Sequence, residues 1–372
     1  MGIETITILI VVTMIALMLL GVPLAWITMT LAVGCTILWF GPSGLPLVAS
    51  RVFGFVSEYV FVAVPLFVFM ACVLERSGVA RDLYDAMYVF AGSLPGGVAV
   101  QTTIVAVVMA AMTGIIGGEI VLLGLIALPQ MLRLGYDRRL AIGTICAGGS
   151  LGTMIPPSIV LILYGLTANV SIGQLFIAGI IPGLMLGTLY IGYILIRCGL
   201  NPALGPPLPL AERKLPRAEK IRLAKGLFLP IMIIVWVLGS IYGGIAAVTE
   251  SAAVGCLGAI VSAWIRGELS WNLLRGALIQ TMTTVGVLLW LTLGANALIG
   301  IYTVMGGTGY LRSMITGLPL PPLGIILVMM GILFVLGMFM DWIGILCSPC
   351  RSSPPQPLRW ASIRCGSASW SA

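Results

Sequence analysis

The segment that decides the fold covers residues 147–158 and reads Ala-Gly-Gly-Ser-Leu-Gly-Thr-Met-Ile-Pro-Pro-Ser. It lies near the centre of an apolar stretch, residues 140–168, where its glycines and paired prolines interrupt a regular helix. Each flanking arm is shorter than the roughly 20 residues that an α-helix needs to cross a bilayer. We therefore expect residues 140–168 to form a re-entrant hairpin and not a membrane span.

The composition of the whole chain points to a bilayer. Of 372 residues, 60% are hydrophobic and only 8% are charged, whereas about a quarter of the residues in soluble domains are charged. These features predict an all-α polytopic membrane protein. The expected helical segments are residues 6–20, 24–40, 59–74, 98–132, 140–168, 175–196, 226–242, 243–265, 274–301 and 323–346, with amphipathic pieces at 79–90 and 310–318.

A second interruption lies inside residues 98–132. A straight helix of this length would exceed about 50 Å, against a hydrocarbon core of about 30 Å. Its middle reads Thr-Gly-Ile-Ile-Gly-Gly over residues 113–118. We expect either one helix broken at these glycines or two helices joined there.

Basic residues indicate the topology. The net charge is +7, and residues 197–225 hold seven basic side chains against two acidic ones. The positive-inside rule places this loop in the cytoplasm. The chain then divides into a first membrane repeat (1–196), the basic loop (197–225), a second membrane repeat (226–346) and a tail without membrane character (347–372).

Similar markers recur on both sides of the basic loop. Leu94-Pro95 corresponds to Leu318-Pro319, Gly114 to Gly337, and Glu119 to Asp341. Inverted repeats with broken helices are a common transporter architecture, so the fold expected is an inverted-repeat transporter. The counterpart of Pro156-Pro157 would lie beyond Ala372, which makes the second repeat incomplete.

The tail, residues 347–372, differs sharply from the chain before it. It is rich in proline, serine and arginine and contains no acidic residue. We hypothesise a frameshift after Leu346, with an evolved disordered tail as the competing explanation.

The interrupted segment also carries the strongest chemical signal. Glycines and prolines within a hydrophobic helix leave backbone carbonyls free, and the hydroxyls of Ser150, Thr153 and Ser158 could join them around sodium. The positive N-terminus of the half-helix after Pro157 would favour an anionic substrate group. The alternative is a proline kink whose glycines serve only close helix packing.

Three acidic residues, Glu119, Glu250 and Asp341, lie in apolar surroundings. A charge at membrane depth is costly, which makes each of them a functional candidate. The alternative is that each caps a helix near the interface, where an acid interacts favourably with the helix dipole. Thr249 and Ser251 beside Glu250 also suit a helix start.

The residues that most enzymes need are missing. The chain has no histidine, and Cys347 and Cys350 form an isolated C-x-x-C that is weak evidence for a metal. No carboxylate pair at acid-base spacing is visible. We expect no enzyme activity, no cofactor and no metal beyond a candidate sodium ion.

Four blocks of sequence together resemble a known family, the large membrane subunit of tripartite ATP-independent periplasmic (TRAP) transporters, or DctM-type permease. The matching blocks are Val64-Pro65-Leu66-Phe67 with Glu75-Arg76-Ser77-Gly78, residues 147–158 with Tyr164-Gly165, residues 248–255, and residues 337–344 around Asp341. The resemblance covers essentially residues 1–346.

This resemblance implies a multi-pass secondary transporter of the bacterial inner membrane, in which a sodium gradient and not ATP supplies the energy. It implies import of organic acids, such as C4-dicarboxylates, sugar acids or keto acids, from a periplasmic substrate-binding protein. A small four-helix membrane subunit would be its partner, and an elevator-like movement would carry the site across. No nucleic acid is involved.

The resemblance also places the sodium and substrate region at residues 148–158 and residues 113–118. The candidate binding residues are Thr113, Gly114, Gly117, Gly118, Gly149, Ser150, Gly152, Thr153, Pro156, Pro157 and Ser158. Because the resemblance ends after Leu346, half of the binding site would be missing. We therefore expect the 372-residue chain not to transport.

Other functions remain open at this stage. A stand-alone sodium-coupled dicarboxylate symporter would share the inverted-repeat architecture but need no binding protein. A membrane-embedded enzyme would need paired titratable groups or a metal cluster, and the sequence shows neither. In a channel or a structural protein, the broken helices and the intramembrane acids would have no function.

Overall fold

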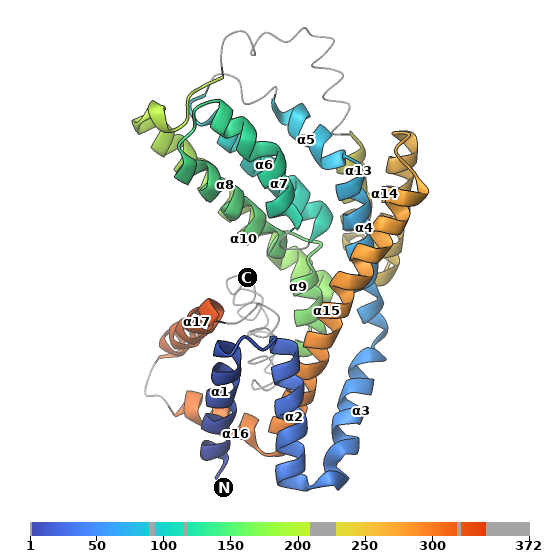
Figure 1. Ribbon diagram of the computed structural model, residues 1–372, viewed down its shortest axis with the longest axis vertical. Coiled ribbons are helices and arrows are strands. Elements are labelled where there is room, and N and C mark those ends of the chain that lie inside the picture. The colour runs from blue at the N-terminus through green and yellow to red at the C-terminus, as the bar shows by residue number, and fades with distance from the viewer. Residues whose placement is uncertain (1, 89–93, 115–117, 209–227, 318–320, 340–372) are drawn as a thin grey trace. The chain divides into compact units, whose positions relative to one another are not determined.

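A computed structural model describes residues 2–88, 94–114, 118–208, 228–317 and 321–339. The described residues fall into two compact units (Figure 1). Unit 1 draws on Met1–Phe61, Leu163–Val170 and Thr283–Ser371, and unit 2 on Val62–Ile162 and Ser171–Met282. Two helices, α9 (Ile159–Ala168) and α15 (Trp271–Val304), contribute residues to both units.

Unit 1 is built from helices near both ends of the chain. Its members, besides parts of α9 and α15, are α1 (Ile3–Leu19), α2 (Leu24–Phe40), η1 (Pro42–Gly44), α3 (Leu45–Val56), α16 (Gly307–Thr316), α17 (Pro322–Phe339) and the start of η2 (Tyr59–Val62). The helix α1 packs on α2 and α16. The Thr7 and Tyr302 hydroxyls lie 2.8 Å apart, and the rings of Trp26 and Trp290 make a tilted contact with 5.2 Å between centroids.

Unit 2 is a helical bundle in which α6 (Gly97–Thr113) is central. The helix α6 contacts α4 (Ala63–Arg76), α5 (Val79–Tyr88), α7 (Gly118–Arg133), α8 (Arg138–Ser150) and α10 (Ile172–Leu200), and Figure 1 shows α6, α7, α8 and α10 side by side. On another side, α4 packs on α14 (Val248–Ile265), which also contacts α13 (Phe228–Tyr242). Two short helices, η3 (Leu151–Thr153) and η4 (Pro202–Leu204), complete the unit.

Apolar residues fill the bundle of unit 2. One buried cluster comprises Leu83, Tyr84, Val105, Ala106, Met109, Leu123, Ala127 and Ile145. A second lies where α6 begins and α10 ends, and comprises Val98, Ala99, Met131, Tyr136, Ala141, Ile194, Cys198 and Leu208. Burying this apolar surface is what holds α5, α7, α8 and α10 against α6.

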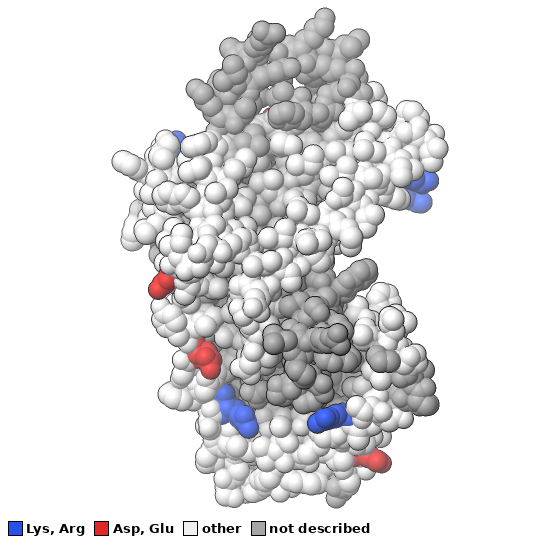
Figure 2. Space-filling model, turned by 180° about the vertical axis from the view of Figure 1, so that it is seen from behind, with Lys and Arg blue, Asp and Glu red and all other residues white. Residues whose placement is uncertain are grey.

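The surface is as apolar as a bilayer requires. Among the described residues, four helical segments are long and apolar enough to cross a membrane, namely Tyr59–Arg76, Ile172–Leu200, Val248–Ile265 and Trp271–Val304. Large apolar side chains such as Leu38, Ile181 and Trp264 are exposed. Charged side chains form only a few separate groups on the face shown in Figure 2. Such surface suits lipid and not water, so the chain is an all-α polytopic membrane protein, as predicted.

Most helix positions agree with the expectation from sequence, and one helix was missed. The predicted break within residues 98–132 is present, since α6 ends at Thr113 and α7 begins at Gly118. The missed helix is α3. The structure carries no bilayer, so the re-entrant character of residues 140–168 stays a prediction.

The proposed repeat also stays a prediction. The helix α6 begins at Gly97, shortly after Leu94-Pro95, and α17 begins at Pro322, shortly after Leu318-Pro319. Gly114 follows the end of α6, whereas Gly337 still lies inside α17. Gly117, Asp341, residues 209–225 of the basic loop and the tail at 347–372 lie outside the described residues.

Candidate ion and substrate site

The break between α6 and α7 forms one side of the candidate site. Gly114 follows the last residue of α6 with a left-handed φ of +60°, and its N–H donates to the Ala110 carbonyl at 3.1 Å. A Cβ atom at this position would overlap the Pro157 carbonyl oxygen. Glycine is therefore required here by both the backbone conformation and the close approach of another segment.

The segment between α8 and α9 forms the other side. The helix α8 starts at an Asp137 cap whose carboxylate accepts from the N–H groups of Arg139 and Leu140. It ends at Ser150, η3 follows, and α9 begins at Ile159. The Ile159 N–H donates to the Gly114 carbonyl at 3.3 Å. Two helix interruptions that are far apart in the sequence thus lie in backbone contact. We call residues 151–158 the tip segment.

A buried carboxylate lies where the two interruptions meet. Glu119, in the first turn of α7, is only 1% exposed and accepts a hydrogen bond from the Thr113 hydroxyl. A Cβ atom at Gly152 would lie 3.1 Å from Glu119 Oε2, so the tip segment approaches the carboxylate directly. Among the described residues, Glu119 Oε2 has no hydrogen-bond partner. A buried charged oxygen without a partner is costly, which favours a cation or a proton beside it.

The hydroxyl groups of the tip segment donate hydrogen bonds to backbone carbonyls. Ser158 donates to the Thr153 carbonyl at 2.6 Å, and Thr153 donates to the Ser150 carbonyl at 2.8 Å. Ser150, at the end of α8, donates to Ala147 at 2.8 Å. Each hydroxyl oxygen keeps its lone pairs after donating its single proton. The segment therefore offers several oxygen atoms, the ligand type that hard cations prefer.

One candidate glycine, Gly149, serves close packing, whereas Gly118 borders the break as the first residue of α7. Gly149 lies inside the last turn of α8, where a Cβ atom would overlap the Ile120 side chain. A Cβ atom at Gly118 would lie 3.5 Å from Glu75 Oε2 on α4. For Gly149 the structure thus favours the alternative of close helix packing. Pro156, Pro157, Gly152, Thr153 and Ser158 all lie in the tip segment.

Glu250 lies at a helix start and not at the interruptions. It is exposed in the first turn of α14, and its Oε2 accepts from the Ala247 N–H at 2.9 Å. This is the capping role that the sequence left open as the alternative, since the carboxylate satisfies one of the free N–H groups of the first turn.

The glycines of α10 that pack against the tip segment were not predicted from the sequence. A Cβ atom at Gly179 of α10 would lie 2.8 Å from the Met154 carbonyl oxygen, and one at Gly183 would lie 2.8 Å from Ile155 Cγ1. These glycines let α10 approach the tip segment closely. Their spacing of four residues, continued by Gly187, is the small-xxx-small pattern that could have revealed them.

Within the described residues, no group of three or more Cys, Asp or Glu side chains gathers as a metal cluster would. The arrangement is one of backbone and hydroxyl oxygens around the buried carboxylate of Glu119, with Glu75 of α4 near Gly118. Interrupted helices that meet inside a membrane protein are typical of one class of proteins, the secondary transporters.

Comparison with known proteins identifies the family. The family model described as "Tripartite ATP-independent periplasmic transporter, DctM component" matches residues 11–347. The chain belongs to this family. It is accordingly a transporter component and not an enzyme, as expected.

Individual relatives agree with the family assignment. The C4-dicarboxylate TRAP transporter large permease protein DctM of Vibrio cholerae is 33% identical over 65% of this chain and 52% of its own length. The protein of the same name from Pseudomonas aeruginosa is 30% identical over 82% of this chain and 70% of its own length. The isethionate TRAP transporter permease protein DctMQ of Oleidesulfovibrio alaskensis is 29% identical over 87% of this chain and 50% of its own length. The chain spans about half the length of the first and third of these relatives.

Proposed function

We propose that this chain is the large permease subunit of a tripartite transporter of the bacterial inner membrane. It takes up organic acids from a periplasmic binding protein, works beside a small four-helix membrane subunit, and uses a sodium gradient as the energy source. The observation that carries the sodium part of this proposal is the meeting of Gly114 with the tip segment beside the buried Glu119.

Sodium fits the chemistry of this meeting point. The site supplies hydroxyl and carbonyl oxygens together with one carboxylate, and Glu119 Oε2 has no hydrogen-bond partner among the described residues. A bound cation would offset the charge of Glu119 without a proton. The residues proposed to surround it are Thr113, Gly114, Glu119, Gly152, Thr153 and Ser158.

An anionic substrate fits the same region. The helix α9 begins at Ile159, directly after Pro157 and Ser158, and a helix N-terminus favours negative charge. The names of two relatives refer to C4-dicarboxylate and isethionate, which are both anions. We therefore propose an organic acid, with a C4-dicarboxylate or sugar acid as the first choice to test.

A stand-alone sodium-coupled dicarboxylate symporter is the alternative. Proteoliposomes that hold the chain and the small subunit separate the two, with labelled succinate outside and an inward sodium gradient. The tripartite function predicts that any uptake requires both the binding protein and sodium, whereas the expectation from the sequence is that the 372-residue chain shows no uptake. Uptake without the binding protein would support the symporter, and uptake that is independent of sodium would contradict the proposed coupling.

A further inference from the structure

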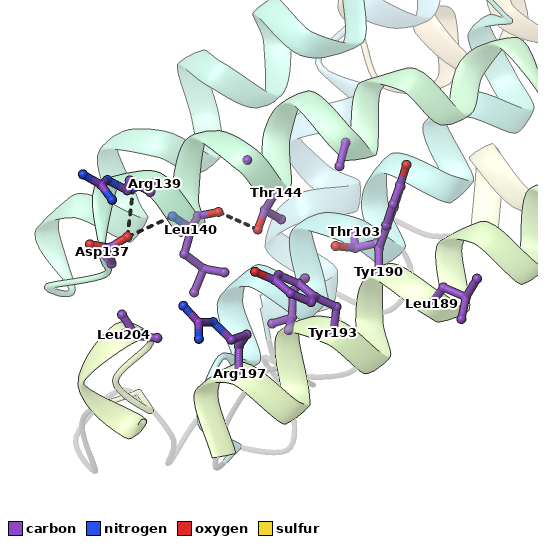
Figure 3. Close-up of a pocket in the computed structure, with 13 residues that line it drawn as sticks. Thr103, Asp137, Arg139, Leu140, Thr144, Leu189, Tyr190, Tyr193, Arg197 and Leu204 are labelled. Atoms are coloured by element: carbon purple, nitrogen blue, oxygen red, sulfur yellow. Dashed lines mark hydrogen bonds between the residues drawn. The ribbon is translucent and has the colours of Figure 1, made fainter. Parts of the chain in front are cut away.

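Unit 2 contains a pocket that is separate from the meeting point of the two helix interruptions. Its volume is about 600 Å³, and it lies among α6, α8, α10 and η4 (Figure 3). Its lining changes character along its length. Figure 3 shows Arg139 and Arg197 at the end where α8 begins and α10 ends, with Thr144, Tyr193 and Tyr190 farther along.

The charged end of the pocket carries excess positive charge. Asp137 is the one acidic residue in the lining, and its carboxylate already accepts from the backbone N–H groups of Arg139 at 3.0 Å and Leu140 at 3.1 Å. Among the described residues, neither Arg139 nor Arg197 forms an ion pair. Figure 3 shows the Arg197 side chain on the pocket side, whereas the Arg139 side chain extends away from the pocket at the start of α8. Arg197 therefore offers a guanidinium group to an anion in the pocket, and guanidinium groups match phosphate oxygens well.

The rest of the lining is mostly apolar, with the hydroxyl groups of Thr103, Thr144, Tyr190 and Tyr193 among apolar side chains. Leu140, Gly143, Ala147 and Leu189 line the pocket beyond the arginines, and Leu189 is 60% exposed. A Cβ atom at Gly143 would meet no other atom within 4 Å. A small water-soluble anion would fill only the charged end. A molecule with an anionic group and a long apolar chain would fill both parts.

The charged end lies at the end of the bundle where basic residues gather. There the Asp137 N–H donates to the Leu204 carbonyl at 3.0 Å, and the Gly96 N–H donates to the Gly205 carbonyl at 2.8 Å. Arg133 and Arg138 belong to the same end, and the basic segment 197–225 continues from Arg197. By the positive-inside rule we assign this end to the cytoplasmic side of the membrane.

We infer that this pocket binds an anionic phospholipid of the cytoplasmic leaflet. Arg197 contacts its phosphate, and one acyl chain lies along Leu140, Gly143 and Leu189. Basic pockets between membrane helices on the cytoplasmic side recognise such headgroups. This inference does not depend on the transport function proposed above.

Lipid binding to the purified full chain in detergent tests the inference. The probes are palmitoyl-oleoyl phosphatidylglycerol, phosphatidylcholine with the same acyl chains, and inorganic phosphate alone, with retained lipid counted by native mass spectrometry. Phosphatidylglycerol is expected to bind more tightly than the other two. Equal binding of phosphatidylcholine, or phosphate that competes as strongly as the whole lipid, would overturn the inference.

A charge variant tests Arg197. Each basic residue near an anionic lipid surface contributes roughly fivefold in affinity. Arg197→Gln should therefore weaken phosphatidylglycerol binding about fivefold. Arg138→Gln is the control, because it removes the same charge from the same end of the bundle but lies outside the lining. An Arg138→Gln effect as large as that of Arg197→Gln would contradict the site.

A second variant tests the apolar part without changing charge. Gly143→Leu places a side chain in the open pocket and should abolish phosphatidylglycerol binding. Gly124→Leu on α7 is its control, since a Cβ atom there also meets nothing within 4 Å but lies outside the lining. Leucine favours a helix more than glycine does, so both variants should fold. Lipid binding by Gly143→Leu at the level of Gly124→Leu would overturn the inference.

Discussion

The backbone N–H of Ile159 donates to the Gly114 carbonyl at 3.3 Å, so the start of α9 is hydrogen-bonded to the end of α6. The bond joins the two places where apolar helices of unit 2 are interrupted. It also holds the tip segment next to Glu119, whose carboxylate lies beside Gly152 and Thr113. Substitutions around this contact should therefore change both stability and ion binding.

Gly114→Ala should destabilise the protein by about 1–3 kcal/mol. The left-handed φ of +60° is unfavourable for alanine, and the new Cβ atom would overlap the Pro157 carbonyl oxygen. Denaturant unfolding in detergent, followed by tryptophan fluorescence, measures the change. Gly124→Ala is the control, because it lies inside α7 with open space and should be neutral or stabilising by up to about 1 kcal/mol. Equal behaviour of both variants would contradict the contact.

Gly179→Leu should lower stability by about 1–3 kcal/mol through overpacking. Its Cβ atom would lie 2.8 Å from the Met154 carbonyl oxygen, which belongs to the tip segment and has little room to move. A Cβ atom at Gly192 on the same helix would meet nothing within 4 Å, so Gly192→Leu is the matched control. The melting temperatures of the two variants decide the matter. A Gly179→Leu protein as stable as Gly192→Leu would show that α10 does not support the tip segment.

Gln280→Ala should cost about 1 kcal/mol of stability, the net contribution of an ordinary hydrogen bond, because the bonds to Arg76 are exposed to solvent. The Gln280 Oε1 accepts from Arg76 Nε at 3.1 Å and from Nη2 at 2.8 Å, and its Nε2 donates to Glu75 at 3.4 Å. These bonds join α4 to the first part of α15 within unit 2. Gln130→Ala on α7 removes a similar side chain and should change stability by less than about 0.5 kcal/mol. A larger loss for Gln130→Ala would refute the role of this network.

Helix positions were predictable from the sequence because local residues mark them. Pro23 and Gly41 flank α2 at the bounds expected, and the glycines at 113–118 separate α6 from α7. The helix α3 was missed because Ser50, Arg51 and Gly54 interrupt its apolar pattern. The local hydropathy pattern thus identifies long apolar helices well, and it identifies short helices that mix polar and apolar residues poorly.

Contacts between distant segments were not predictable from one sequence. Nothing near Gly149 reveals that Ile120 packs against it, and nothing near Gly114 reveals that Pro157 lies opposite. Glu250 reads as an intramembrane acid by composition, yet its carboxylate caps α14. The pocket of Arg139 and Arg197 also arises only when the two ends of distant helices meet. These features depend on tertiary packing, which periodicity does not encode.

Sodium-dependent stabilisation of the purified chain tests the central claim most directly. Melting temperatures are measured in sodium chloride and in potassium chloride of equal concentration for the unsubstituted protein, Glu119→Gln and Glu250→Gln. At a hundredfold excess over Kd, bound sodium should stabilise the protein by about 2.7 kcal/mol. The account predicts this sodium effect for the unsubstituted protein and for Glu250→Gln, and its loss in Glu119→Gln. A sodium response in Glu119→Gln that equals that of the unsubstituted protein, or no difference between the two salts, would contradict it.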